Sequence, residues 1–159
     1  TQSFLRTFTP FVRIGFQNIA DETKSAFNAA MSYNMLNGIK IGSEGSELDF
    51  TKVLVSIGPL YSAADINANI VKNELQFSWD PTPREDAKSD DQSMVLAFNP
   101  AKVEAVHDIN AGKRSSSKAK INLPVNWKGD VIETYIAFKS ADGTVVSDSV
   151  YAGQFNVDI

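Results

Sequence analysis

The spacing of apolar residues changes from a helical to an alternating period near residue 45. In the first segment, apolar residues recur at intervals of one, three and four, which places them on one face of a helix. These residues are Phe4, Leu5, Phe8, Phe11, Val12, Phe16 and Ile19. Pro10, preceded by Thr9 as a candidate cap, predicts a kink or a new helical start within this stretch.

A second helix is predicted over residues 21–37. Its inner stripe consists of Ala26, Phe27, Ala30, Met31, Asn34 and Met35. Gly38 suits the left-handed conformation that often ends a helix. The link at Ala20 and Asp21 is short, so the two helices are expected to form a hairpin or an L-shaped pair. Residues 1–40 are therefore predicted to be a helical segment.

Beyond residue 45, apolar and polar residues alternate in short runs bounded by turn residues, which is typical of β-strands. The candidate strands cover residues 50–57, 70–79, 94–98, 103–109, 115–123, 131–139 and 145–157. Asp142-Gly143 suits a hairpin turn, and turn signals recur about every 8–12 residues. The fold class is therefore α+β and mainly β, with a seven-stranded antiparallel sandwich over residues 46–159.

Composition narrows the classes of function. The chain has 159 residues, 43% of them hydrophobic, which is enough for one domain with a core. Its net charge of −4 provides no basic field for nucleic acid. Cysteine is absent, so disulfides and thiolate-bound metals are excluded. No apolar run approaches the roughly 20 residues of a membrane helix. The first residue is Thr1, which suggests a missing preceding segment and leaves the compartment open, with the cell surface, the extracellular space or a virion favoured.

Two stretches of the β region resemble fibronectin type III domains. Residues 75–80 (LQFSWD) resemble the second strand of that fold, where a tryptophan anchors the core. Leu123, Trp127, Gly129 and Tyr135 resemble its turn into the sixth strand, where a leucine and a tyrosine pack at a corner. The resemblance covers residues 48–159 and implies a fold but no function. It makes Trp79, Leu123 and Tyr135 the expected core anchors, with the tyrosine hydroxyl bonded to the corner backbone.

Five segments together resemble an uncharacterised family of Bacteroidota proteins, a domain of unknown function, over nearly the whole chain. They are residues 11–16 (FVRIGF), 33–34 (YN), 52–56 (KVLVS), 138–143 (FKSADG) and 146–151 (VSDSVY). The resemblance implies a bacterial source, or a phage or mobile element of such bacteria. Members of the family carry a glycine-rich basic segment before the first helix, and the family brings no catalytic residues.

Catalytic groups are sparse in the sequence. His107 is the single histidine, it lies on an alternating strand, and a zinc site would need further ligands that cysteine does not provide. No nucleophile elbow is present. His107 is therefore interpreted as a half-exposed strand residue, and no enzyme activity, cofactor or metal is expected.

Two charged loops offer weak binding chemistry. The acidic loop contains Glu85, Asp86, Asp90 and Asp91. Carboxylates suit calcium, but their spacing fits no EF-hand, so a solvated loop is favoured. The basic loop contains Lys113, Arg114, Lys118 and Lys120. It lacks the interleaved aromatic residues that stack on bases, so it is interpreted as a soluble turn, and no nucleic-acid partner is expected.

Aromatic residues provide the remaining functional hypotheses. Trp127, Tyr61 and Tyr151 could stack on sugar rings, with packing as the alternative. The phenylalanine-rich first segment must bury its apolar face, either against its own sandwich and second helix or in a subunit interface. The final strand offers an edge for pairing with another chain.

The expected interaction residues are Phe4, Phe8, Phe11, Phe16 and Phe155. We predict a non-enzymatic structural or interaction protein that binds a protein partner or itself, as a subunit of a bacterial surface structure or a phage virion. The alternative is a glycan-binding module.

Overall fold

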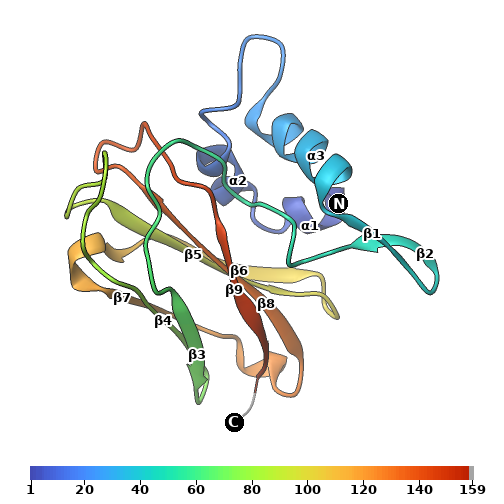
Figure 1. The fold of residues 1–159 in the computed structure, drawn as a ribbon. Helices are drawn as coiled ribbons and strands as arrows, with labels where there is room; N and C mark the ends of the chain where they lie inside the picture. Colours follow the sequence, from blue (N-terminus) through green and yellow to red (C-terminus); the bar gives the residue numbers. More distant parts are fainter. Residues whose placement is uncertain (158–159) are drawn as a thin grey trace.

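The computed structural model describes residues 1–157 (Figure 1). The described part of the chain contains three α-helices and nine strands. The helices are α1 (Gln2–Arg6), α2 (Thr9–Gly15) and α3 (Ala26–Asn37). The strands are β1 (Ile39–Gly42), β2 (Gly45–Leu48), β3 (Asn67–Val71), β4 (Glu74–Ser78), β5 (Gln92–Asn99), β6 (Glu104–Lys113), β7 (Lys118–Asn122), β8 (Val131–Lys139) and β9 (Val150–Asn156).

The nine strands form three antiparallel sheets. β1 and β2 make a separate hairpin, β3-β4-β7 make a three-stranded sheet, and β6-β5-β8-β9 make a four-stranded sheet. The seven strands β3 to β9 therefore form the two larger sheets, and the described chain is mostly β, as the alternating pattern predicted. The β1–β2 hairpin was not expected.

The four-stranded sheet is covered on both faces, by the three-stranded sheet on one side and by the helices on the other (Figure 1). Along β5, Met94, Leu96 and Phe98 pack in the core beneath the helices. Val95 and Ala97 pack in the core between the two sheets. The helices and the four-stranded sheet therefore share one core. Both predicted segments, 1–40 and 46–159, contribute residues to it.

Of the two outcomes predicted at Pro10, a kink or a new helical start, the structure has the new start, so the helical region contains three helices within the described residues. The first segment is divided into α1 and α2, because Pro10 starts a new helix in its first turn. α3 begins at Ala26 rather than at residue 21. Ser25 caps this start, because its Oγ accepts a hydrogen bond from the Asn28 amide at 3.1 Å. Gly38 has φ of −107° and is not left-handed. A Cβ there would lie 2.6 Å from Val53 Cγ1, so the residue is required for space.

Residues 50–57 are not the predicted strand but an irregular segment. The side chain of Asn34 takes the place of a neighbouring strand: its Oδ1 accepts from the Leu54 amide and its Nδ2 donates to the Leu54 carbonyl, both at 2.9 Å. Val53 and Val55 are buried nonetheless. The alternating pattern therefore predicted correctly which side chains are buried. It did not predict that the backbone of Leu54 bonds to an amide side chain instead of to a neighbouring strand.

The remaining strand predictions differ mainly in their boundaries. The stretch 70–79 is part of a hairpin, with a turn at Lys72, which has φ of 58°. β6 continues to Lys113, through residues predicted to be a turn. β9 begins at Val150, five residues after the predicted start at Val145. β8 has the predicted bounds of 131–139.

Arg114 and Asp91 form a buried ion pair that fixes three loops to one another. Arg114 Nε lies 3.0 Å from Asp91 Oδ2, and both side chains are almost fully buried. The guanidinium also donates to the carbonyls of Ser62 and Tyr61, and its carbon lies 4.5 Å from the centre of the Phe138 ring. Each guanidinium nitrogen thus donates a hydrogen bond, and the Phe138 ring packs against the group, which are the conditions under which a buried charge is tolerated.

We expect Asp91→Ala to lower the free energy of unfolding by about 3–5 kcal/mol, because the arginine is then left buried without its counter-ion. Urea denaturation measures the change. Lys120→Ala is the matched control, since Lys120 and Glu74 form an exposed pair at 3.7 Å and such a pair contributes less than about 1 kcal/mol. Equal losses in the two variants would contradict the structural role of the Arg114–Asp91 pair.

His107 packs against α2. Its ring centroid lies 6.3 Å from that of Phe11 in an edge-to-face arrangement. Burial lowers the pKa of the imidazole below its usual 6.5, and the carboxylate of Asp108 opposes the shift. The unfolded chain therefore binds a proton at His107 more readily than the folded chain does.

Because the pKa of His107 is lower in the folded chain, His107 should not affect the free energy of unfolding above pH 6.5. Below pH 6.5 the free energy of unfolding should fall until the pH has passed the lowered pKa of the folded chain. His107→Gln should flatten this part of the profile of unfolding free energy against pH, measured by urea denaturation between pH ~8 and pH ~5. If the variant and the wild-type protein lose stability in parallel across this window, the histidine is not the responsible group.

Candidate functional site

Four large apolar side chains lie exposed where α3 ends and the β1–β2 hairpin begins. We call this the α3–hairpin surface, and its members are Met35, Leu36, Ile39 and Ile41. Their exposed fractions are 59%, 84%, 37% and 91%, respectively. α3 carries apolar residues on more than one side. Ala29 and Ala30 are buried with Asn34, whereas Leu36 and Met35, the latter expected on the inner stripe, are exposed. A helix of that kind is normally covered on both sides.

The hairpin itself projects from the body of the molecule (Figure 1). Lys40 on β1 is paired in register with Glu47 on β2, and Lys40 Nζ lies 3.9 Å from Glu47 Oε1. Within residues 1–157, neither β1 nor β2 pairs with a third strand. An isolated two-stranded hairpin is marginally stable in water, so its free edges are suited to pairing with another chain.

The structure corrects the expected interaction role of the N-terminal phenylalanines. Phe4, Phe8, Phe11 and Phe16 are buried in the core beneath the helices. The physical reason is the second face of the four-stranded sheet, whose apolar side chains require a cover. The alternative, that the first segment covers its own sandwich, is therefore the observed arrangement.

The edge of the sandwich is where sequence analysis placed it. Phe155 lies on β9 and packs partly into the core between the sheets. β9 is the last strand of its sheet as far as the chain is described, with β8 as its only neighbour in that sheet. Phe155 therefore belongs to an edge strand, with its ring directed largely inward.

The three expected core anchors are all buried, but they do not share a core. Trp79 and Leu123 lie between the two sheets, whereas Tyr135 lies on the helix-covered face. The Tyr135 hydroxyl donates to the Phe50 carbonyl at 2.7 Å. The expected bond to the corner backbone is therefore wrong, because the alternation of β8 directs this tyrosine away from the corner. Burial raises its pKa, so the hydroxyl stays a donor.

The aromatic residues proposed to bind sugars are engaged elsewhere. Trp127 is fully buried, and its indole Nε1 donates to Glu104 Oε1 at 2.8 Å. The Tyr151 hydroxyl donates to Glu133 Oε1 at 2.6 Å, and burial together with this bond raises the pKa of the tyrosine. Tyr61 is partly buried. The structure thus provides no exposed tryptophan platform in residues 1–157.

The two charged loops meet through their members Asp91 and Arg114, the buried pair described above. Neither residue is therefore available to a ligand, which corrects the grouping of Arg114 with the basic loop. No group of three or more His, Cys, Asp or Glu residues suited to a metal ion occurs within residues 1–157. In the same range, no helix has the length and apolar character needed to cross a membrane.

Sequence reasoning missed the hairpin and one buried carboxylate. The hairpin had a short signal in the alternation Ile39-Lys40-Ile41 followed by Gly42 and Gly45, the latter at φ of 105°. The carboxylate is Glu133, which lies on β8 among buried neighbours and is only 3% exposed. A charged residue inside an otherwise apolar strand was the available signal.

The chain is similar to several solved structures and matches one protein family. None of the curated proteins matches the chain. Among solved structures, it is similar to the fibronectin type III domain of the human collagen α-1(XX) chain, at 10% identity and a TM-score of 0.42, covering 62% of this chain and 86% of that domain. It is also similar to a chain described as a myokine, at 11% identity and a TM-score of 0.45, covering 64% and 100% of the two chains.

The comparison with family models covers almost the whole chain. A family of unknown function, DUF6266, matches residues 1–153, and the chain therefore belongs to this family.

Proposed function

We propose that this protein is a non-enzymatic interaction module that self-associates through the α3–hairpin surface. The observation that carries the proposal is the exposure of four large apolar side chains beside a hairpin whose outer edges pair with no other strand of residues 1–157. Water contact with this much apolar surface is unfavourable, and a second chain would remove it.

The hairpin favours a second copy of this chain as the partner. An antiparallel pair of β1 strands centred on Lys40 places Ile39 opposite Ile41 of the second copy, and the reverse. Ile39 and Ile41 lie on the same face of β1. In this pairing the four isoleucines of the two copies therefore lie together on one face of the joined sheet. The two hairpins would together make a four-stranded sheet, which is more stable than either alone.

The charges of the hairpin are compatible with this pairing. The same register brings the two Lys40 side chains opposite each other, where like charges would repel. Each lysine, however, already lies beside the carboxylate of its own Glu47. The axis would therefore carry two exposed ion pairs, whose carboxylates offset part of the repulsion between the lysines. The contact would be two-fold symmetric and closed.

The wider setting of the proposal is a subunit of a bacterial surface structure or a phage virion. A closed dimer does not extend into a larger assembly, so this role needs a second contact. The backbone of the outer edge of β9, the strand that carries Phe155, is our candidate for it. The alternative of a glycan-binding module has less support, because Trp127 is buried beneath the surface.

We expect the wild-type protein to form a concentration-dependent dimer, and we expect Ile41→Lys to weaken it at least about tenfold, because a charge replaces an apolar contact at the pair. Size-exclusion chromatography with light scattering over a concentration series measures the association. Val125→Lys is the matched control, since Val125 is also highly exposed, at 76%, but lies outside the α3–hairpin surface.

Two results would contradict the proposed self-association. The first is a strictly monomeric wild-type protein at the highest concentration. The second is a dimer that Ile41→Lys and Val125→Lys affect equally. Circular dichroism of both variants confirms that any loss of association is not a loss of folding.

A further inference from the structure

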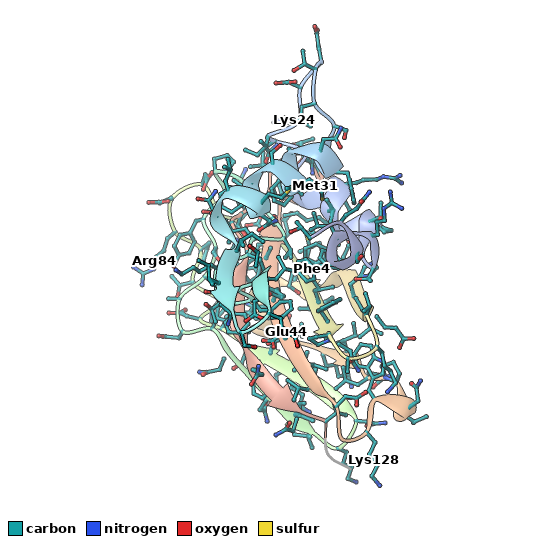
Figure 2. The ribbon with its side chains drawn as sticks, turned by 90° about the vertical axis from the view of Figure 1, so that its right-hand side faces the viewer. Phe4, Lys24, Met31, Glu44, Arg84 and Lys128 are labelled. Carbon is teal, nitrogen blue, oxygen red and sulfur yellow. The ribbon has the colours of Figure 1, made fainter. Side chains whose placement is uncertain are left out.

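A hollow of about 470 Å³ opens between the hairpin, α1 and the ends of β5, β8 and β9. Figure 2 turns this side of the molecule towards the viewer, with Phe4 and the hairpin residue Glu44 labelled. Among the residues that line the hollow are Phe4, Phe50, Phe98, Glu133 and Gln154. Its size lies within the range of ~300–1,000 Å³ common for small-molecule sites.

Glu133 is a buried carboxylate that forms no ion pair within the described residues 1–157. It lies on β8 between its cross-strand partners Phe98 on β5 and Gln154 on β9. Its oxygens accept one bond each, from the Tyr151 hydroxyl at 2.6 Å and from Gln154 Nε2 at 2.8 Å. Within residues 1–157, the four ion pairs do not include Glu133.

The protein groups around Glu133 leave part of its acceptor capacity open to the hollow. An ionised carboxylate can accept about four hydrogen bonds, and the structure supplies two, both from neutral groups. Burial of a carboxylate without an opposite charge is unfavourable. A ligand that brings a positive charge and N–H donors would satisfy both deficits.

Aromatic rings form the walls beside this carboxylate. The Phe4 and Phe98 centroids are 4.7 Å apart with the rings nearly perpendicular, and Phe50 lies 5.7 Å from Phe98. The Tyr135 hydroxyl holds the backbone of Phe50 in place. Ring faces attract cations, and ring walls also accept an aliphatic stem. Lys40 and Glu47 at the rim neutralise each other, so they add no net charge.

We propose that this hollow binds an aliphatic ammonium group, with the Glu133 carboxylate as the acceptor and the phenylalanine rings around the stem. The ligand is either a free alkyl amine or a lysine side chain of another protein, since both present the same group. A single carboxylate among aromatic rings is poorly suited to a metal ion, which needs several oxygen ligands.

The first test compares two probes of similar shape on the wild-type protein by isothermal titration calorimetry at neutral pH. We expect n-butylammonium to bind saturably and at least about tenfold tighter than 1-butanol, because only the ammonium forms a charged hydrogen bond. Equal affinities, or no saturable binding of the ammonium, would overturn the proposal. This comparison needs no variant and is independent of variant folding.

The second test locates the site. Glu133→Gln keeps the shape of the side chain and should abolish the preference for the ammonium over the alcohol. Glu85→Gln is the control, because it makes the same charge change in an exposed loop and should leave the preference unchanged. If both variants retain the preference, the cation binds elsewhere and the assignment to the hollow fails.

The same titration with cadaverine and with Nα-acetyl-lysine N-methylamide distinguishes the two sources. Tighter binding of the free diamine indicates a small-molecule ligand. Tighter binding of the lysine derivative indicates a side chain presented by a protein. Binding of neither would overturn the proposal together with the first test.

Discussion

The burial of the four-stranded sheet on both faces is the constraint on which the rest of the structure depends. Strands β5 and β8 have almost no exposed position, so both of their alternating sets of side chains must be packed. The three-stranded sheet covers one set, and the N-terminal helices with residues 49–57 cover the other. The polar groups on the helix-covered face need partners under that cover. Tyr135 finds the Phe50 carbonyl, and Glu133 finds Tyr151 and Gln154.

The sequence predicted those parts of the fold that follow from local periodicity. The strand at 131–139 was predicted with its bounds, because alternation and turn residues agree there. Residues 50–57 were wrongly predicted to be a strand by the same reasoning. A period of two indicates which side chains are buried, but it does not indicate which groups hydrogen-bond to the backbone. The side chain of Asn34 occupies the position that a strand would take. No local pattern encodes this contact, which joins residues 20 positions apart.

The candidate sites were harder to predict, for a related reason. The pattern of Phe4, Phe8, Phe11 and Phe16 required a cover for that face but did not say whether the cover belongs to the same chain. The charges of Asp91 and Arg114 could be counted, but their pairing could not, because it depends on two loops meeting in space. The strands of the hairpin are only four residues long, too short for periodicity to stand out. Whether such a residue lies on the surface or in the core thus depends on tertiary contacts, which the sequence pattern does not specify.

The hairpin connects the two proposals physically. Lys40, Glu47 and Leu48 line the hollow, while the outer edge of β1 is the proposed contact between copies. Pairing of two β1 strands would stabilise the hairpin and so fix one wall of the hollow. A ligand bound against that wall would, by the same linkage, favour the paired hairpin over the unpaired one. The two binding events would then strengthen each other by the same factor, since coupling between binding free energies is reciprocal.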